Sequence, residues 1–515
     1  GGLLTNTNQH VAFNRMMSRE ASIGIDGVYY NPAGVVFMGD GHHLAINWQL
    51  AYQTRTINND YKLFTNNVNN PITPRDFKGK AFAPVIPSFQ YAYNKGKWSF
   101  QANFSLTGGG GKCTFDNGLG SFEKIVSETA IAACGLAGVV DQTLGNTLGQ
   151  QGMEMFTSDK AFGKTGKYSF NSYMHGRQYY YGLSVGAAYK FCDNFSAFLG
   201  VRGVYALTNY YGYVENINVG NMPLYKVLDP TKENAANIEL SCDQTGVGFT
   251  PIIGVDYKTG RWNFSAKYEF KTRIRLKNKS VNQTPSIGNL PANLANQMTG
   301  ILTARYQQAG LPLEQAKQQA ENTTNTVLSD PKVGATMMGL KTQFDQKLNK
   351  AIGEYEDGKK IAGDIPGYLA LGIGYSPVDA VRVNVGFHWF DDKNATSYNN
   401  RNKELKRGTL EYNAGVEVDV NKKITLSTGW QNTNYGLSDE YMDDKSFVVS
   451  SNSAAIGGVY HINKKMDLNV AYFHTFYQHK KTSETVQLAA DKSIVYNSDY
   501  TRNNNVFAVG LDINF

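Results

Sequence analysis

The sequence has no long hydrophobic run. Its mean hydropathy is -0.39, and its most apolar stretch, from Ile125 to Val140, is interrupted by Glu128. A helix that spans a bilayer needs about 20 largely apolar residues, so the sequence predicts no bundle of transmembrane helices. A transmembrane β-barrel is not excluded by this test, because only every second residue of its strands faces lipid.

No catalytic constellation stands out, and motifs for metal binding and cofactor binding are missing. The sequence contains no C-x-x-C and no histidine pair spaced for a metal on a helix, since His42 and His43 are adjacent. The 50 basic residues slightly outnumber the 43 acidic ones, but no run of consecutive basic residues is longer than a pair, whereas a nucleic-acid-binding protein carries a clustered basic patch. We therefore expect no enzyme, no cofactor or metal, and no nucleic-acid partner.

Cysteine is scarce, with 4 residues in 515. Cys113 and Cys134 fall in one predicted loop, so they are candidates for a disulfide in an oxidising compartment. Free thiols are the alternative, and the sequence leaves both open. The chain begins at Gly1 without a methionine, which we interpret as a mature, processed form.

Aromatic residues and glycine are abundant, with 32 Tyr, 27 Phe and 52 Gly. Their arrangement is clearest at the C-terminus, where apolar and small or polar residues alternate strictly from Asn505 to Phe515. Such alternation places apolar side chains on one face of a β-strand. The pattern fits either a half-buried edge strand of a soluble protein or the closing strand of a membrane barrel, and the remaining sequence decides for the barrel.

Fourteen segments alternate in this way. They cover approximately residues 42–57, 81–94, 97–108, 176–191, 195–212, 246–258, 261–277, 366–376, 380–391, 408–420, 423–433, 453–462, 466–478 and 503–515. Short turns rich in Gly, Asn, Asp and Pro alternate strictly with longer connections, and these residues suit tight turns. An even strand number with short turns at one end and long loops at the other is typical of outer-membrane barrels. The sequence therefore predicts an all-β fold, a 14-stranded antiparallel transmembrane β-barrel over residues 42–515, with both termini periplasmic and the long loops extracellular.

Three loops are large, at about residues 109–175, 213–242 and 279–364. Apolar residues recur at helical spacing around Phe122 to Ala130 and around Leu294 to Tyr306. We therefore expect partly helical extracellular loops. Their apolar faces either pack on one another or collect a hydrophobic ligand.

Residues 1–41 precede the first strand and do not alternate. Their aromatic residues and glycines favour a packed plug, or hatch, inside the barrel over a disordered leader. The candidate hatch residues are His10, Phe13, Asn31, Pro32 and Ala33.

The inward positions of the predicted strands mix charged and aromatic residues, whereas a water-filled porin lumen would be more uniformly polar. This mixture suits an amphipathic ligand with an apolar body and an anionic head. The alternative is that the charges pair with one another and with the hatch. The candidate ligand-binding residues are Tyr180, Phe198, Arg202, Val204, Ile252, Lys267, Tyr368, Arg382, His388 and Phe473.

The third strand runs into four glycines, and Pro87 interrupts the second strand. Glycine marks bulges and kinks in strands, and proline removes a donor from the ladder. A kinked strand beside a broken ladder would open the barrel wall sideways; the alternative is a flexible loop start. The candidate kink residues are Asn103, Ser105, Gly108, Gly109 and Gly110.

A plug carrying Asn31-Pro32-Ala33, fourteen strands and the terminal Phe515 resemble the FadL/TodX family of outer-membrane transporters for long-chain fatty acids and hydrocarbons. This resemblance implies passive uptake of a hydrophobic small molecule by a monomer that contacts outer-membrane lipid and lipopolysaccharide. It implies capture by loops 213–242 and 279–364, binding in the lumen, rearrangement of the hatch, and lateral exit at the third strand. A general porin for polar solutes and a surface adhesin or structural barrel are the alternatives.

Overall fold

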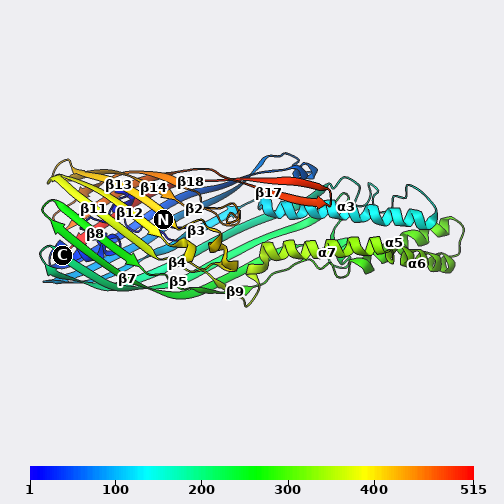
Figure 1. Ribbon diagram of the computed structural model, residues 1–515, viewed down its shortest axis with the longest axis horizontal. Helices are drawn as coiled ribbons and strands as arrows, with labels where there is room; N and C mark the ends of the chain where they lie inside the picture. Colours follow the sequence, from blue (N-terminus) through cyan, green and yellow to red (C-terminus); the bar gives the residue numbers. More distant parts are fainter.

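The computed structural model describes residues 1–515, and its strands form one sheet that closes into a barrel (Figure 1). Strand β1 pairs with β2 on one side and with β18 on the other, both antiparallel, so the sheet has no open edge at membrane depth. The strands are β1 Gly41–Tyr61, β2 Arg75–Lys95, β3 Trp98–Phe115, β4 Tyr168–Cys192, β5 Phe195–Val219, β6 Met222–Pro223, β7 Ile238–Thr259, β8 Trp262–Glu269, β9 Arg275–Ser280, β10 Lys360–Ala362, β11 Tyr368–Val378, β12 Val381–Phe390, β13 Thr409–Asp419, β14 Ile424–Asn434, β15 Ser451–His461, β16 Met466–Tyr477, β17 Lys480–Ala489 and β18 Lys492–Asn514.

Several of these strands are halves of one spanning strand. Strands β8 and β9 both pair with β7, β11 and β10 pair with these two halves in turn, and β16 and β17 both pair with β18. Strand β6 has 2 residues and lies in a loop. Counted this way, fourteen antiparallel strands close the barrel, which confirms the predicted fold class.

The strands are longer than the alternation predicts. Strands β4 and β5 have 25 residues each, whereas about 10 suffice to span a membrane. Strand β3 continues to Phe115 and β4 begins at Tyr168, so the loop predicted at 109–175 is shorter. The glycine run of the third strand lies within β3 and is not a loop start.

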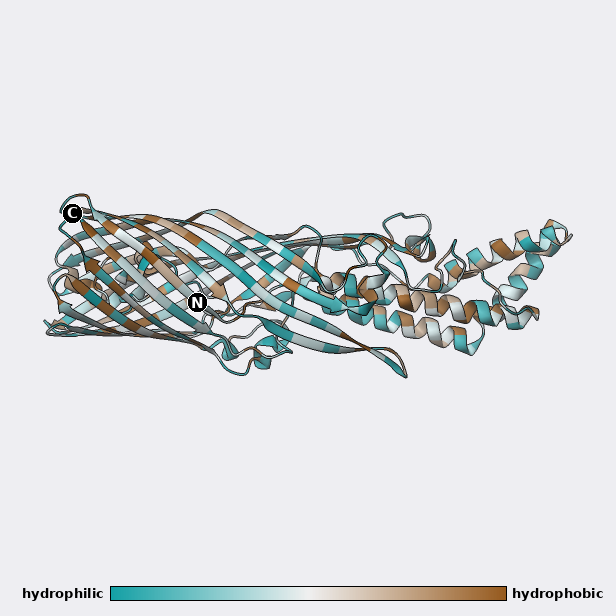
Figure 2. Ribbon diagram, turned by 90° about the horizontal axis from the view of Figure 1, so that it is seen from above, coloured by the Kyte–Doolittle hydropathy of each residue, from teal (hydrophilic) through white to brown (hydrophobic).

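The outer face of the barrel is apolar along a band. Leu199 and Phe249 are 69% and 70% exposed, and aromatic residues flank them, as lipid-facing bands of barrels require. Next to the helices, the strand segments are largely hydrophilic (Figure 2). A surrounding membrane accounts for this exposed apolar band.

Long helices extend beyond one end of the barrel (Figure 1). A core of 44 buried residues runs through these helices and the adjoining strand ends. Their apolar faces thus pack on one another, in agreement with the helical spacing in the sequence. The helices of this extension are α3 Gly120–Leu148, α5 Leu290–Gln308, α6 Leu313–Leu328 and α7 Pro331–Ile352.

Helix α3 is, by length and composition, the one helix long and apolar enough to cross a membrane, with a window of mean hydropathy 1.2. In the structure, 67% of that window is buried against neighbouring segments. Packing within the extension therefore accounts for its apolar character.

The remaining helices are short. Three lie in the N-terminal segment and five in the loops. They are α1 Val11–Met16, α2 Gly27–Tyr30, η1 Pro32–Met38, η2 Lys62–Asn66, α4 Tyr225–Leu228, η3 Gly353–Tyr355, η4 Asp392–Asn394 and η5 Tyr398–Glu404. All four cysteines are free thiols, so Cys113 and Cys134 are not joined here.

Candidate ligand cavity and hatch

The N-terminal segment, residues 1–41, here called the hatch, enters the barrel ahead of β1 (Figure 1). The side chain of His10 caps α1 by accepting from the Ala12 N–H at 2.9 Å. Met17 ends this helix in a left-handed conformation. Wall hydroxyls donate to carbonyls that the hatch leaves unpaired: Ser88 donates to the Gln9 oxygen at 2.7 Å. Every buried backbone group needs such a partner, and the barrel wall supplies them here.

Glycines in the wall leave room for the hatch backbone. A Cβ atom at Gly429 would lie 1.6 Å from the Met16 carbonyl oxygen, and one at Gly415 would lie 2.2 Å from it. A Cβ at Gly372 would lie 2.6 Å from the Glu20 Cβ. Any larger side chain at these positions would collide with the hatch. The wall is therefore shaped to the hatch on this side.

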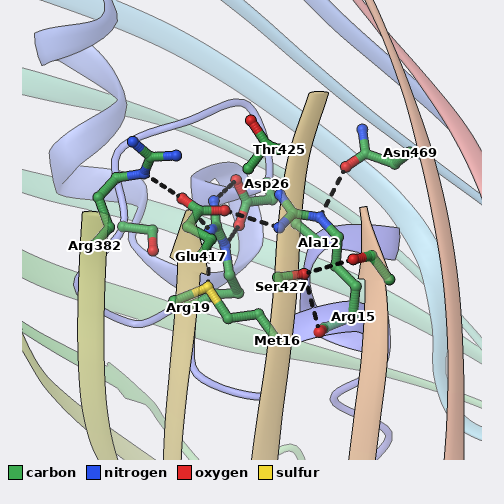
Figure 3. Close-up of polar contacts among 12 residues, drawn as sticks. Ala12, Arg15, Met16, Arg19, Asp26, Arg382, Glu417, Thr425, Ser427 and Asn469 are labelled. Atoms are coloured by element: carbon green, nitrogen blue, oxygen red, sulfur yellow. Dashed lines mark hydrogen bonds and ion pairs between the residues drawn. The ribbon is translucent and has the colours of Figure 1, made fainter. Parts of the chain in front are cut away.

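A cluster of buried charges joins the hatch to the wall (Figure 3). Glu417 on β13 accepts from Arg15 at 2.8 Å and from Arg382 on β12 at 2.7 Å, and it lies 3.4 Å from Arg19. Arg19 also forms a bidentate pair with Asp26 at 2.7 and 3.0 Å. Because its carboxylate contacts two arginines of the hatch and one of the wall, Glu417 is the centre of this charged cluster.

A second charged group lies on β5 and β8. Lys267 lies 2.9 Å from Glu269, donates to the Tyr29 carbonyl at 2.6 Å, and stands 3.8 Å above the Tyr29 ring. Arg202 pairs with the same Glu269. Both wall cations are thus occupied by a wall carboxylate and the hatch.

A histidine makes a third link. His388 on β12 bonds the carboxylate of Glu20 in the hatch through one ring nitrogen. The other ring nitrogen lies 2.8 Å from Glu411 of β13. Hatch and wall therefore share a fully buried polar chain at this point.

The five predicted hatch residues all contact the wall or one another. His10 lies 2.9 Å from Asp512, Asn31 donates to Asp256 at 2.8 Å, and Gln101 donates to the Pro32 carbonyl at 2.8 Å. The Ala33 carbonyl accepts from Ser196. Phe13 stacks on Tyr30 within the hatch, with ring centroids 5.4 Å apart.

Most of the predicted ligand-binding residues are engaged by the hatch or by their neighbours. Arg202, Lys267, Arg382 and His388 are in the charged groups above. Of the six others, Phe198 and Ile252 pack on hatch residues, Tyr180 and Val204 pack on the β8–β9 side of the wall, and Tyr368 packs on Phe390. The alternative that these side chains pair and pack with the hatch describes this arrangement. That they bind ligand stays a prediction.

A cavity lies beside the hatch and has a volume of about 270 Å³. Of the predicted ligand-binding residues, Phe473 lines it, together with Phe13 and Met17 of the hatch. The hatch contributes residues 1–8 to its boundary. Apolar and polar side chains both line the cavity, which is slightly below the usual range for small-molecule sites.

One end of the cavity is cationic. Arg55 on β1 and Arg502 on β18 face each other directly across the ladder, and Lys445 joins them in the lining. No aspartate or glutamate lines the cavity. Arg502 donates to Gln53 at 2.8 Å, and the Nε atoms of both Arg55 and Arg502 are buried with no partner. Two like charges directly opposite destabilise a sheet, so this pair is suited to an anion between or beside them.

The other side of the cavity reaches a break in the wall. Strands β2 and β3 pair at Ala81 and again at Phe89, but not between these positions. On β3, the opposite segment carries bulges on either side of Gly108 and Gly109. Residues of both unpaired segments line the cavity, among them Ala83, Ile86, Pro87, Leu106, Gly110 and Gly111.

The first hatch residues border this break. Thr5 forms a bridge with Gly108, the Asn6 N–H donates to the Thr107 carbonyl at 2.8 Å, and the Asn6 amide donates to the Gly109 carbonyl at 2.6 Å. Of the predicted kink residues, Gly108, Gly109 and Gly110 lie in the break. Asn103 and Ser105 bond the hatch at Gln9 just beside it.

Sequence reasoning missed the cationic end. Arg55 stands at an inward position of the first predicted strand, so the alternation contained the signal. Arg502 precedes the last predicted strand by one residue, and Lys445 lies in a loop. No alternation in the sequence indicated that Arg502 or Lys445 faces the cavity.

The fold and site define a transmembrane-type β-barrel with an internal hatch, a cavity and a gap in its wall. No family model and no curated protein matches the sequence. Solved structures match the fold. A FadL homologue from Pseudomonas aeruginosa aligns with a TM-score of 0.59 at 13% identity, over 100% of both chains. The Pseudomonas putida toluene transporter TodX aligns with a TM-score of 0.50 at 13% identity, again over 100% of both. The predicted resemblance is thus confirmed for the fold.

Proposed function

We propose that this protein is a passive outer-membrane channel for hydrophobic molecules, including amphipathic molecules with an anionic head. The observation that carries the proposal is one cavity that joins a cationic end to a gap in the barrel wall. The acid head binds at Arg55 and Arg502, and the apolar body lies along the side that leads to the gap. Each buried methylene contributes ~0.8 kcal/mol, so a long acyl chain binds without many polar contacts.

The proposed route begins at the extracellular loops 213–242 and 279–364, which capture the ligand, and continues into the cavity. The hatch then rearranges, and the ligand leaves laterally between β2 and β3 into the membrane. In this proposal the termini are periplasmic, the long loops are extracellular, the protein is a monomer in contact with outer-membrane lipid and lipopolysaccharide, and no enzymatic step occurs. The solved structures described as a FadL homologue and a toluene transporter support a hydrophobic cargo.

A general porin is the weaker alternative, because the hatch is bonded to the wall around the lumen and leaves a cavity of about 270 Å³. An adhesin has one observation in its favour, the long helical extension (Figure 1). Surface adhesion that survives deletion of the hatch but not of the extension would favour this alternative.

A disulfide across the gap tests the lateral exit. A Cβ atom built at Gly111 lies 3.6 Å from the Cβ of Ala83, within the range that a disulfide requires. We would introduce Ala83→Cys and Gly111→Cys together in a Cys113→Ala background, with each single cysteine variant as a control.

Two measurements follow. Binding of oleate is measured on protein in nanodiscs, and uptake of labelled oleate is measured in cells that carry the variant in their outer membrane. We expect saturable binding in every variant, and uptake that stops in the oxidised double variant and returns on reduction. Absence of saturable binding would refute the hydrophobic cargo, and unchanged uptake through the oxidised variant would refute the lateral route.

A further inference from the structure

Five cations share the outer face of one strand at the mouth of the barrel. From Lys271 onward, every second residue is basic and points out of the wall, while the residues between them are buried. Strand β9 contains most of this segment, which we call the basic ladder. Its members are Lys271, Arg273, Arg275, Lys277 and Lys279.

Most of the basic ladder has no acidic partner. Arg275 pairs with Asp364 at 2.7 Å, but the other four side chains are in no ion pair within 4.0 Å. Asp243 of β7 is opposite Lys279 where β7 and β9 pair, yet its carboxylate accepts from Asn209 at 2.6 Å. On the other side, the exposed Lys360 of β10 stands opposite Lys277 and adds a further cation.

The basic ladder begins where the apolar band ends. Phe270 is 42% exposed, and Lys271 follows it directly and is also exposed. On the neighbouring β7, Phe249 and Val247 are 70% and 64% exposed, and the next outward residue is Thr245. The cations therefore start at the boundary of the lipid-facing surface and continue toward the helical extension.

The height of the basic ladder selects among lipids. Eight residues at about 3.3 Å each, tilted by about 45°, rise by about 19 Å. The headgroup layer on one side of a phospholipid bilayer is only about 5–8 Å thick. Most of the cations thus stand above the level that a phospholipid phosphate reaches, at the level of a headgroup that carries phosphates further out.

We propose that the basic ladder binds the phosphorylated sugar headgroup of lipopolysaccharide in the outer leaflet. This inference rests on the proposed outer-membrane placement and not on the transported cargo. Lys and Arg near an anionic lipid surface each contribute about 1 kcal/mol, and a row of them at several heights matches several phosphates along one headgroup.

The test uses the full chain in neutral nanodiscs and three probes: lipopolysaccharide with a phosphorylated inner core, the same material after chemical removal of its phosphates, and vesicles of phosphatidylglycerol. The variant is Arg273→Gln, Lys277→Gln and Lys279→Gln combined. The matched control is Lys422→Gln, Lys464→Gln and Lys465→Gln combined, which removes the same charge from exposed turns at the opposite end of the barrel.

We expect the control to bind the phosphorylated glycolipid like the wild type and the ladder variant to bind it roughly 100-fold more weakly. We also expect weak binding of the dephosphorylated form and of phosphatidylglycerol. Equal affinity of the two variants would overturn the proposal, and so would phosphatidylglycerol binding as tightly at equal phosphate concentration. Oleate uptake by the ladder variant, measured in parallel, separates a failure of this site from a failure of the proposed transport.

Discussion

Neutralising Glu417 should loosen the hatch without unfolding the barrel. Glu417→Gln keeps the shape of the side chain but leaves Arg15 and Arg19, whose side chains are 5% and 6% exposed, without their shared anion. Removing one partner of a buried ion pair costs about 3–5 kcal/mol, because the other charge stays buried and uncompensated. Arg19 retains Asp26, so we expect the lower end of this range.

A loss of about 3 kcal/mol raises the population of the undocked hatch more than about 100-fold. Hydrogen exchange of residues 10–26 in nanodiscs measures this directly, and single-channel conductance reports whether the lumen becomes passable to ions. The barrel itself should keep its heat-resistant mobility on gels, because its strands remain paired.

Asp419→Asn is the matched control. Asp419 also pairs with Arg382, at 2.7 Å, but it contacts no hatch residue and its side chain is 37% exposed. An exposed pair of this kind contributes about 0–1 kcal/mol, so exchange in the hatch should remain as in the wild type. If exchange in Glu417→Gln equals that in Asp419→Asn, the reasoning that Glu417 holds the hatch is wrong.

Three further substitutions probe the fit of the hatch against the wall glycines, the cationic end of the cavity, and the loop that contains Asp392. Gly429→Ala places a Cβ 1.6 Å from the Met16 carbonyl oxygen, so overpacking should destabilise the docked hatch by about 1–3 kcal/mol, measured by the same exchange. Arg55→Gln should weaken oleate binding about 10–100-fold, the contribution of a charge-assisted hydrogen bond, and leave binding of a neutral hydrocarbon unchanged in calorimetry. Burial raises the pKa of Asp392 from 3.8 to about 7. The folded loop therefore binds the proton of this carboxyl more tightly than the unfolded loop does, and the loop is most stable below about pH 4. Its stability should fall by up to ~4 kcal/mol as the pH rises to 7, and Asp392→Asn should abolish this dependence in hydrogen exchange of residues 391–408.

A specific result would contradict each of these three predictions. Gly203→Ala is the control for Gly429→Ala, since no atom lies closer than 3.9 Å to its new Cβ. Equal hydrogen exchange of the hatch in both glycine variants would contradict the close fit between hatch and wall. A parallel loss of hydrocarbon and oleate binding in Arg55→Gln would indicate a collapsed cavity and not a lost headgroup contact. A loop that becomes more stable between pH 4 and 7 would contradict the sign argued for Asp392.

The strands could be predicted because a membrane enforces the pattern. Where one face meets lipid, as from Phe264 to Phe270, alternation is strict, and the tight turns need particular residues. Above the membrane both faces meet water or loops, so the pattern weakens. The sequence therefore gave no strand at Lys480–Ala489 and ended the third strand seven residues before Phe115.

The candidate site could be predicted less well. Alternation correctly assigns Arg202 and His388 to the inner face, but it gives no depth and no partner. Whether such a side chain meets a ligand or the hatch depends on contacts between residues hundreds of positions apart, such as Glu20 with His388. The glycines of β3 and Pro87 did indicate the position of the wall break, because their effect on the backbone is local. They lie in or beside the segments of β2 and β3 that do not pair.

The chemistry of the hatch contacts explains how a filled barrel could open in the proposed transport. Buried ion pairs add little net stability, because the attraction between the charges is offset by their lost hydration. A hatch held by Glu417, Glu269 and His388 is therefore fixed in position, while its release into a hydrated lumen costs less than the number of contacts suggests. Residues 4–8 are attached more weakly still, by a few hydrogen bonds at the edge of the wall break. Because they bond β3 at that break, we expect displacement of this short segment to be the smallest motion that widens the proposed lateral route. Exchange in residues 4–8 should accordingly be faster than in residues 10–26 even in the wild type.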